Sequence, residues 1–212
     1  MFEKIKYDID AIRERDPAAR SRAEVLLLYS GLHAVMYHRV AHFFYRHDMK
    51  FLARMISQHA RFMTGVEIHP GAKIGKGLLI DHGAGVVIGE TAVIGDNCTI
   101  YQGVTLGGTG KDVGKRHPTI GNNVMIGSGA KVLGPFKVGD NSKIAAGAVV
   151  LNEVPSDSTA VGVPARVISK KKSASCSDSL DQVHIPDPVA QEICKLRAEI
   201  EALEKRISEI EK

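Results

Sequence analysis

A six-residue repeat between about residues 65 and 168 constrains this chain most. An aliphatic residue recurs at every sixth position, often followed by glycine. Six is the period of neither an α-helix nor a hairpin strand. It is typical of a parallel β-helix, in which each hexapeptide supplies one short strand and a turn. The thirteen aliphatic positions are Ile68, Ile74, Ile80, Ile88, Ile94, Ile100, Leu106, Ile120, Ile126, Val132, Val138, Ile144 and Val150. We expect these side chains to point inward and to stack about 4.8 Å apart along the axis.

The repeat is interrupted twice. Ile80 and Ile88 are separated by eight residues instead of six. Leu106 and Ile120 are separated by fourteen, which predicts a loop, GGTGKDVGKRHPT, that leaves the regular body. Long loops on a rigid scaffold are where function concentrates, so both interruptions are candidate functional positions.

Glycine usage divides the chain. Of its 21 glycines, all but Gly31 lie between Gly65 and Gly162. Residues 1–64 carry apolar residues at helical spacing, with helices expected near the N-terminus and over 31–47 and 49–63. The predicted fold is α+β: a helical region (1–64), a β-helix domain (65–168), a polar linker (169–186) and a helix (187–212).

The last segment has a heptad pattern. Its apolar positions alternate spacings of four and three, which is typical of a coiled coil. They are Val189, Ile193, Leu196, Ile200, Leu203, Ile207 and Ile210. A helix of this length is marginal alone in water, so the pattern predicts self-association.

Composition excludes several classes of protein. With 44% apolar and 25% charged residues, the chain is not disordered. A net charge of +4 argues against a dedicated nucleic-acid binder. The most apolar stretch, 25–40, is interrupted by polar residues, so no membrane span is expected, and the N-terminus does not resemble a signal peptide. Three cysteines at unrelated spacings fit neither a disulfide framework nor a zinc site and favour a reducing, cytoplasmic location.

Candidate chemistry lies at the interruptions. His82 follows Asp81 at the first one, and an exposed imidazole can act as a general base near neutral pH. Glu67, fifteen residues earlier, is spaced so that its carboxylate could orient that imidazole. Arg116 and His117 lie in the long loop, where the guanidinium suits a carboxylate, although a solvated basic loop is equally compatible. Cys98 holds an inward repeat position and is expected to be a small core residue.

Three motifs carry a family resemblance: RDPAAR, DHGAGVVIGETA, and TLGGTGK followed by RHP. Together they resemble bacterial serine O-acetyltransferases over about three quarters of the chain. The resemblance implies a left-handed β-helix and transfer of acetyl from acetyl-CoA to the L-serine hydroxyl. The product, O-acetyl-L-serine, serves cysteine biosynthesis. No metal is implied.

The resemblance also implies residue roles. His82 matches the general base, and Glu67 matches its partner, which is commonly Asp in the family. Asp16 and Asp81 match the contacts to the serine ammonium, and Arg116 and His117 match the binders of its carboxylate. The positions that match acetyl-CoA contacts are Gly108, Thr109, Ser128, Lys143, Ala146 and Arg166.

Family members bind acetyl-CoA between neighbouring subunits, which implies a homotrimer, and L-cysteine is implied as a feedback inhibitor. The N-terminal extension that joins two trimers in longer members is not expected here. Within one trimer, we expect the three heptad tails to associate. Because the chain ends Glu211-Lys212 instead of in Ile, a complex with O-acetylserine sulfhydrylase is not expected.

Three other interpretations compete with this one. A related acetyltransferase could act on a sugar or another small acceptor. A zinc-binding solenoid would need three converging histidines, for which His82, His117 and His69 are the nominees, without the usual spacing. A non-catalytic scaffold could use its coiled coil to recruit partners.

Overall fold

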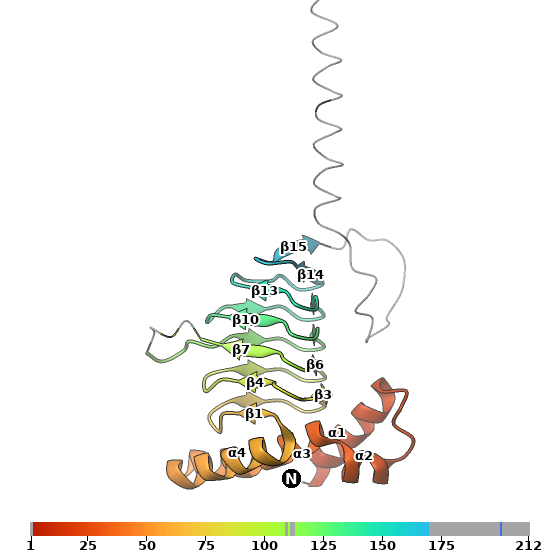
Figure 1. The fold of residues 1–212 in the computed structure, drawn as a ribbon, viewed down its shortest axis with the longest axis vertical. Helices are drawn as coiled ribbons and strands as arrows, with labels where there is room; N and C mark the ends of the chain where they lie inside the picture. The colour runs from red at the N-terminus through yellow and green to blue at the C-terminus, as the bar shows by residue number, and fades with distance from the viewer. Residues whose placement is uncertain (1, 109, 111–112, 170–199, 201–212) are drawn as a thin grey trace, which may run out of the picture.

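A computed structural model describes residues 2–108, 110, 113–169 and 200 of the chain. A group of helices covers one end of a tall parallel β-helix, and a loop leaves the β-helix about halfway along it (Figure 1). The predicted linker lies outside the described residues, apart from Ser169, and so does the predicted coiled coil, apart from Ile200.

The β-helix has three flat faces. The first face contains β1 (Glu67–Ile68), β4 (Val87–Ile88), β7 (Thr105–Gly107), β10 (Lys131–Leu133) and β13 (Val149–Val150). The second contains β2 (Lys73–Ile74), β5 (Val93–Ile94), β8 (Thr119–Ile120) and β11 (Lys137–Val138). The third contains β3 (Leu79–Asp81), β6 (Thr99–Tyr101), β9 (Met125–Ile126), β12 (Lys143–Ile144), β14 (Ser158–Val161) and β15 (Arg166–Ser169). The chain visits the faces in this order, so β1 to β13 make four complete turns.

The predicted repeat is confirmed in its register. Ile68 pairs with Ile88, and Ile88 pairs with Leu106, each one turn further along the axis. Of the thirteen aliphatic positions, twelve are at most 4% exposed, and Ile74 is partly buried. Cys98 is fully buried among them as expected, and burial raises the pKa of its thiol to about 11.

The last strand departs from the predicted repeat. β15 runs antiparallel to β14, with Ser158 opposite Ser169 and Val161 opposite Arg166. The hexapeptide pattern therefore ends before residue 168. β15 forms a hairpin with β14 and covers its edge. A further parallel coil would otherwise have covered that edge.

Four helices make up the N-terminal region: α1 (Phe2–Arg15), α2 (Arg22–Leu28), α3 (Ser30–Arg46) and α4 (Lys50–Thr64). The helices expected over 31–47 and 49–63 are confirmed to within one residue at each end. α4 ends at Gly65, whose left-handed conformation (φ 72°) lets the chain turn into β1. Gly31 of α3 packs directly on β3, because a Cβ there would lie 2.1 Å from the Ile80 carbonyl oxygen.

Arg15 joins α1 to the β-helix. Its guanidinium donates hydrogen bonds to the backbone oxygens of Gly77, Asn97 (3.0 Å) and Cys98 (3.0 Å) and to Thr99 Oγ1 (3.0 Å). These acceptors come from two successive turns of the β-helix. The end of α1, and with it Asp16, therefore has a defined position against the third face.

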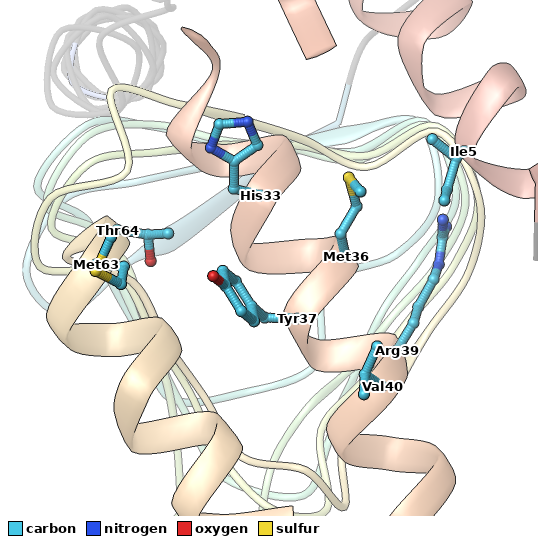
Figure 2. Close-up of a pocket in the computed structure, with 8 residues that line it drawn as sticks. All are labelled: Ile5, His33, Met36, Tyr37, Arg39, Val40, Met63 and Thr64. Carbon is cyan, nitrogen blue, oxygen red and sulfur yellow. The ribbon is translucent and has the colours of Figure 1, made fainter. Parts of the chain in front are cut away.

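The helical region also contains a cavity of about 450 Å³ (Figure 2). Side chains from α1, α3 and α4 line it: Ile5, His33, Met36, Tyr37, Arg39, Val40, Met63 and Thr64. None of the residues singled out from the sequence as catalytic or ligand-binding belongs to this lining. No described helix has the length and apolar character needed to cross a bilayer.

Candidate active site

The turn from the third to the first face, which we call the His82 corner, accounts for the first interruption of the repeat. His82 itself has a left-handed backbone (φ 57°), followed by Gly83 (φ 55°) and Gly85 (φ 72°). The two extra residues widen this turn, and the His82 side chain is 75% exposed. Its Nε2 lies 3.7 Å from Asp81 Oδ1. The corner thus presents an accessible imidazole beside a carboxylate.

Asp16, the residue after α1, is linked through Tyr29 to the part of α3 that packs on β3. Asp16 Oδ1 accepts a hydrogen bond from the Ala18 N–H (2.8 Å), and Oδ2 accepts one from the Tyr29 hydroxyl (2.6 Å). Burial is the main cause that raises the pKa of Tyr29, followed by the hydrogen bond to Asp16, and the charge of Asp81 contributes as well. Three carboxylates, those of Asp16, Glu24 and Asp81, therefore act on one phenol, although 65 residues separate Asp16 from Asp81 in the sequence.

Glu67 has a different ionic partner from the one expected. It is the first residue of β1, beside Val87 of β4, and its carboxylate lies 3.1 Å from Arg61 Nη1. The carboxylate within ion-pair distance of His82 is that of Asp81. A catalytic role for Glu67 stays a prediction.

The turn from the first to the second face, the Arg116 corner, holds the second set of residues. Arg116 Nη2 lies 2.5 Å from Glu90 Oε2, and the Tyr45 hydroxyl donates to Glu90 Oε1 (2.9 Å). These hydrogen bonds, that of Arg116 first, lower the pKa of Glu90 and keep it ionised. The Arg116 guanidinium is thereby oriented by a carboxylate that is itself held by α3.

His117 is buried at this corner and has a defined tautomer. The Thr91 N–H donates to its Nδ1 (3.2 Å), so in the neutral ring the proton resides on Nε2. Burial lowers the pKa of His117, which favours the neutral form. Gly89 makes room for the ring, since a Cβ at this position would lie 2.0 Å from it. His117 can therefore donate one hydrogen bond to a ligand through Nε2.

The comparisons with known proteins bear on this arrangement. Family models match in three places: "Serine acetyltransferase, N-terminal" over residues 1–36, a hexapeptide repeat of succinyl-transferase over 85–108, and the bacterial transferase hexapeptide over 117–152. A serine acetyltransferase of Bacillus subtilis is 54% identical over 215 aligned positions, which cover 98% of this chain and 99% of the relative. The chain belongs to the serine acetyltransferase family.

Solved structures of the family have the same fold. One, a serine acetyltransferase in complex with cysteine, is 45% identical with a TM-score of 0.82, over 86% of this chain and 71% of the other. Another, a serine acetyltransferase from Brucella abortus in complex with coenzyme A, is 46% identical with a TM-score of 0.78, over 82% and 69% of the two chains.

In this family member, the two corners lie on opposite edges of the first face. His82 and Asp81 lie at one edge, and Arg116 and His117 lie at the other. Within a single chain, the width of a β-sheet therefore separates the two sets of predicted serine ligands.

The predicted acetyl-CoA positions are distributed over several parts of the β-helix. Ser128 and Ala146 follow β9 and β12 at the His82 corner, one and two turns beyond β6. Lys143 lies in β12 and Arg166 in β15, further along the same third face. Gly108 directly follows β7 at the Arg116 corner, and Thr109 lies outside the described residues.

Two columns of left-handed residues distinguish the corners. At the His82 corner the column is Gly85, Gly103, Gly129 and Gly147, with φ between 68° and 72°. At the corner between the second and third faces it is Asn97, Asn123 and Asn141, with φ between 55° and 58°. Since asparagine tolerates this conformation, the glycines are not demanded by the backbone alone. Their effect is to add no side chains of their own along the edge beyond His82.

Three residues at the site were not singled out from the sequence: Glu90, Tyr45 and Tyr29. Glu90 was visible inside the motif VVIGETA, where an acidic residue follows a strand at a corner. No sequence pattern pointed to the two tyrosines, because each binds a residue that is distant in the sequence and that no repeat connects with it.

The structure does not bring the nominated zinc ligands together. His82 lies at one corner, whereas His69 and His117 lie at the other. Within the described part of the chain, no group of three or more His, Cys, Asp or Glu side chains is arranged to hold a metal ion.

Proposed function

We propose that this chain transfers the acetyl group of acetyl-CoA to the hydroxyl of L-serine, at sites that are each built from two subunits of a homotrimer. Membership of the serine acetyltransferase family supports the activity. The observation that carries the residue assignment is the geometry of the His82 corner, where an exposed imidazole lies 3.7 Å from Asp81. The charge of Asp81 also acts on Tyr29, the hydrogen-bond partner of Asp16.

His82 acts as the general base. Its imidazole accepts the proton of the serine hydroxyl as that oxygen attacks the thioester carbon. The C–O bond forms, the tetrahedral intermediate collapses, and the C–S bond breaks. The imidazolium then returns the proton to the departing sulfur, so that O-acetyl-L-serine and CoA leave and the enzyme is unchanged. Asp81, 3.7 Å from the imidazole, favours its transient positive charge.

The other residues assigned to substrate binding suit a zwitterionic amino acid. Asp16 and Asp81 complement the serine ammonium group. Arg116, oriented by Glu90, presents donors suited to the serine carboxylate, and His117 Nε2–H adds another. L-cysteine carries the same two charged groups, so it would occupy the same site as a competitive inhibitor. A sugar substrate would leave these charges unpaired, which disfavours the alternative acceptor.

The separation of the two corners supports an assembly with shared sites. Within one chain, the first face keeps Arg116 and His117 away from His82. In a ring of three β-helices packed side by side, the His82 corner of one subunit would face the Arg116 corner of the next. A closed trimer would therefore complete three sites, one between each pair of neighbouring subunits.

Shared sites predict complementation between inactive subunits. We expect His82→Asn and Arg116→Ala chains, co-expressed with different tags and purified together, to regain about a quarter of the wild-type activity at random one-to-one mixing in a three-membered ring. Each mixed trimer would contain one interface with both residues intact. Steady-state rates of the mixture and of each variant alone would measure this. If the mixture is only as active as the average of the two variants, each site belongs to one chain.

Acetyl-CoA would lie along the glycine column that leads away from His82. A Cβ at Gly129 or Gly147 would meet nothing within 4 Å, so this edge is open. An extended pantetheine chain can lie close to such a backbone, and its thioester end would then reach His82.

The glycine column predicts a selective binding defect. Gly129→Asn adds a side chain to the open edge, while its backbone (φ 70°) suits asparagine, as at Asn123 and Asn141. We expect the KM for acetyl-CoA to rise by about tenfold or more, equivalent to about 1.4 kcal/mol of lost binding, with the KM for serine little changed. Asn123→Gly, the reverse change at the other column, is the matched control and should alter neither constant. An unchanged KM for acetyl-CoA in Gly129→Asn would locate the cofactor elsewhere.

The assay that tests the function itself is CoA release from acetyl-CoA over a panel of acceptors. We expect release with L-serine, competition by L-cysteine, and much slower release with sugars or simple amines. Release with a sugar but not with serine would favour the related acetyltransferase class, and no release with any acceptor would favour a scaffold. The cytoplasm, as the compartment that supplies acetyl-CoA, is the proposed location, and the unpaired, buried Cys98 is compatible with it.

A further inference from the structure

Tyr29 lies where the helical region meets the active-site corner. It is the single residue between α2 and α3: its N–H donates to the Val25 oxygen at the end of α2 (3.3 Å), and its own oxygen accepts the His33 N–H at the start of α3 (3.1 Å). Its backbone is thus fixed by two helices. Two residues later, Gly31 packs on Ile80, the neighbour of Asp81. The position of Tyr29 is therefore tied to β3, the strand that ends at Asp81 just before His82.

The phenol of Tyr29 meets the carboxylate of Asp16 directly. The hydroxyl donates to Asp16 Oδ2 at 2.6 Å, and the other oxygen, Oδ1, is held by the Ala18 N–H. Both carboxylate oxygens therefore have a donor that fixes their orientation. Asp16, the residue after α1, is only partly buried, so these two donors restrict the rotation of its side chain.

Tyr29 remains a donor at physiological pH. Burial, then the hydrogen bond to Asp16 and the nearby carboxylates, raise the pKa of the phenol well above its ordinary value. A neutral hydroxyl that donates to Asp16 can orient this carboxylate without neutralising its charge. The negative charge thus stays available for a cationic ligand.

We infer that Tyr29 is a positioning residue that holds the Asp16 carboxylate in place for the ammonium group of the amino acid substrate. This inference rests on the proposed function, because it uses the role of Asp16 in binding serine. It implies that Tyr29 contributes to the preference for acceptors that carry an ammonium group. It does not imply a role in proton transfer or in binding acetyl-CoA.

The test compares Tyr29→Phe with Tyr37→Phe in the full-length enzyme. Tyr37 also lies on α3 but lines the cavity of Figure 2, so it is a matched control for loss of a phenolic hydroxyl. In Tyr29→Phe we expect the KM for L-serine and the Kd for L-cysteine, measured by calorimetry, to rise by about tenfold, the lower range for losing a hydrogen bond to a charged group. The KM for acetyl-CoA and the thermal unfolding midpoint should match those of Tyr37→Phe.

Two further measurements separate positioning from general disturbance. The inhibition constant of 3-hydroxypropanoate, which has the hydroxyl and carboxylate of serine but no ammonium group, should be unchanged by Tyr29→Phe. In an Asp16→Asn background, Tyr29→Phe should produce no additional change in the Kd for cysteine. Equal losses for cysteine and 3-hydroxypropanoate, full additivity with Asp16→Asn, or an unchanged KM for serine would each overturn the inference. A wild-type enzyme that releases no CoA with serine would instead overturn the proposed function.

Discussion

We expect His82→Asn to lower kcat for serine acetylation by about 100-fold or more, the usual scale for a positioned general base. Asparagine cannot shuttle a proton near neutral pH, yet it accepts the left-handed backbone (φ 57°) that this position requires. An alanine at the same φ would combine the loss of the base with backbone strain. Because the His82 side chain is 75% exposed, the fold should be retained. Single-turnover and steady-state rates with saturating acetyl-CoA would measure the effect.

His59→Asn is the control for this substitution. His59 is an exposed histidine of α4 that contacts Tyr37 edge-on, away from both corners. We expect its kcat to equal that of the wild type. A folded His82→Asn enzyme with near-normal turnover would show that another group accepts the proton, and Glu67 would then be the first residue to test.

The second large effect is expected for Arg116→Ala. A charge-assisted contact to a carboxylate contributes about 1.5–3 kcal/mol, so the KM for serine should rise by about 10- to 150-fold. The KM for acetyl-CoA should change far less, because Glu90 holds the guanidinium at the Arg116 corner, whereas the glycine column lies at the His82 corner. Initial-rate kinetics with each substrate varied in turn would separate the two constants.

Arg22→Ala is the matched control, because it removes an arginine from an exposed ion pair with Asp10 (2.7 Å) that includes no residue assigned to the site. Its kinetic constants should be those of the wild type. Arg116→Lys retains the charge without the planar guanidinium. Its KM for serine should therefore lie between those of Arg116→Ala and Arg22→Ala. If Arg116→Ala raised only the KM for acetyl-CoA, the loop before His117 would bind the cofactor and not serine.

The β-helix was predictable from the sequence because its contacts repeat at a constant separation. Ile68, Ile88 and Leu106 stack because each is one turn from the next, and the same rule applies along the chain. Inward positions are therefore marked by aliphatic residues and corners by glycine or asparagine. The interruption after Ile80 also marked a candidate site, because extra residues at one turn widen that corner, and His82 lies there.

The composition of the site depended on contacts that no repeat encodes. Asp16 has a defined position against the third face because Arg15 binds carbonyl oxygens of two turns of the β-helix and Tyr29 donates to the carboxylate. Glu90 was predictable as a corner residue, but its partners Arg116 and Tyr45 come from a loop and a helix whose separations follow no period.

Local periodicity was enough to predict the solenoid, the position of its corners, and the histidine and arginine at the two interruptions of the repeat. The folded chain was needed to show that Tyr29 holds Asp16 and that Arg116 lies across the first face from His82. The docking of helices on a β-helix depends on shape and on hydrogen bonds between distant residues, such as Gly31 against Ile80, and these leave no regular pattern in the sequence.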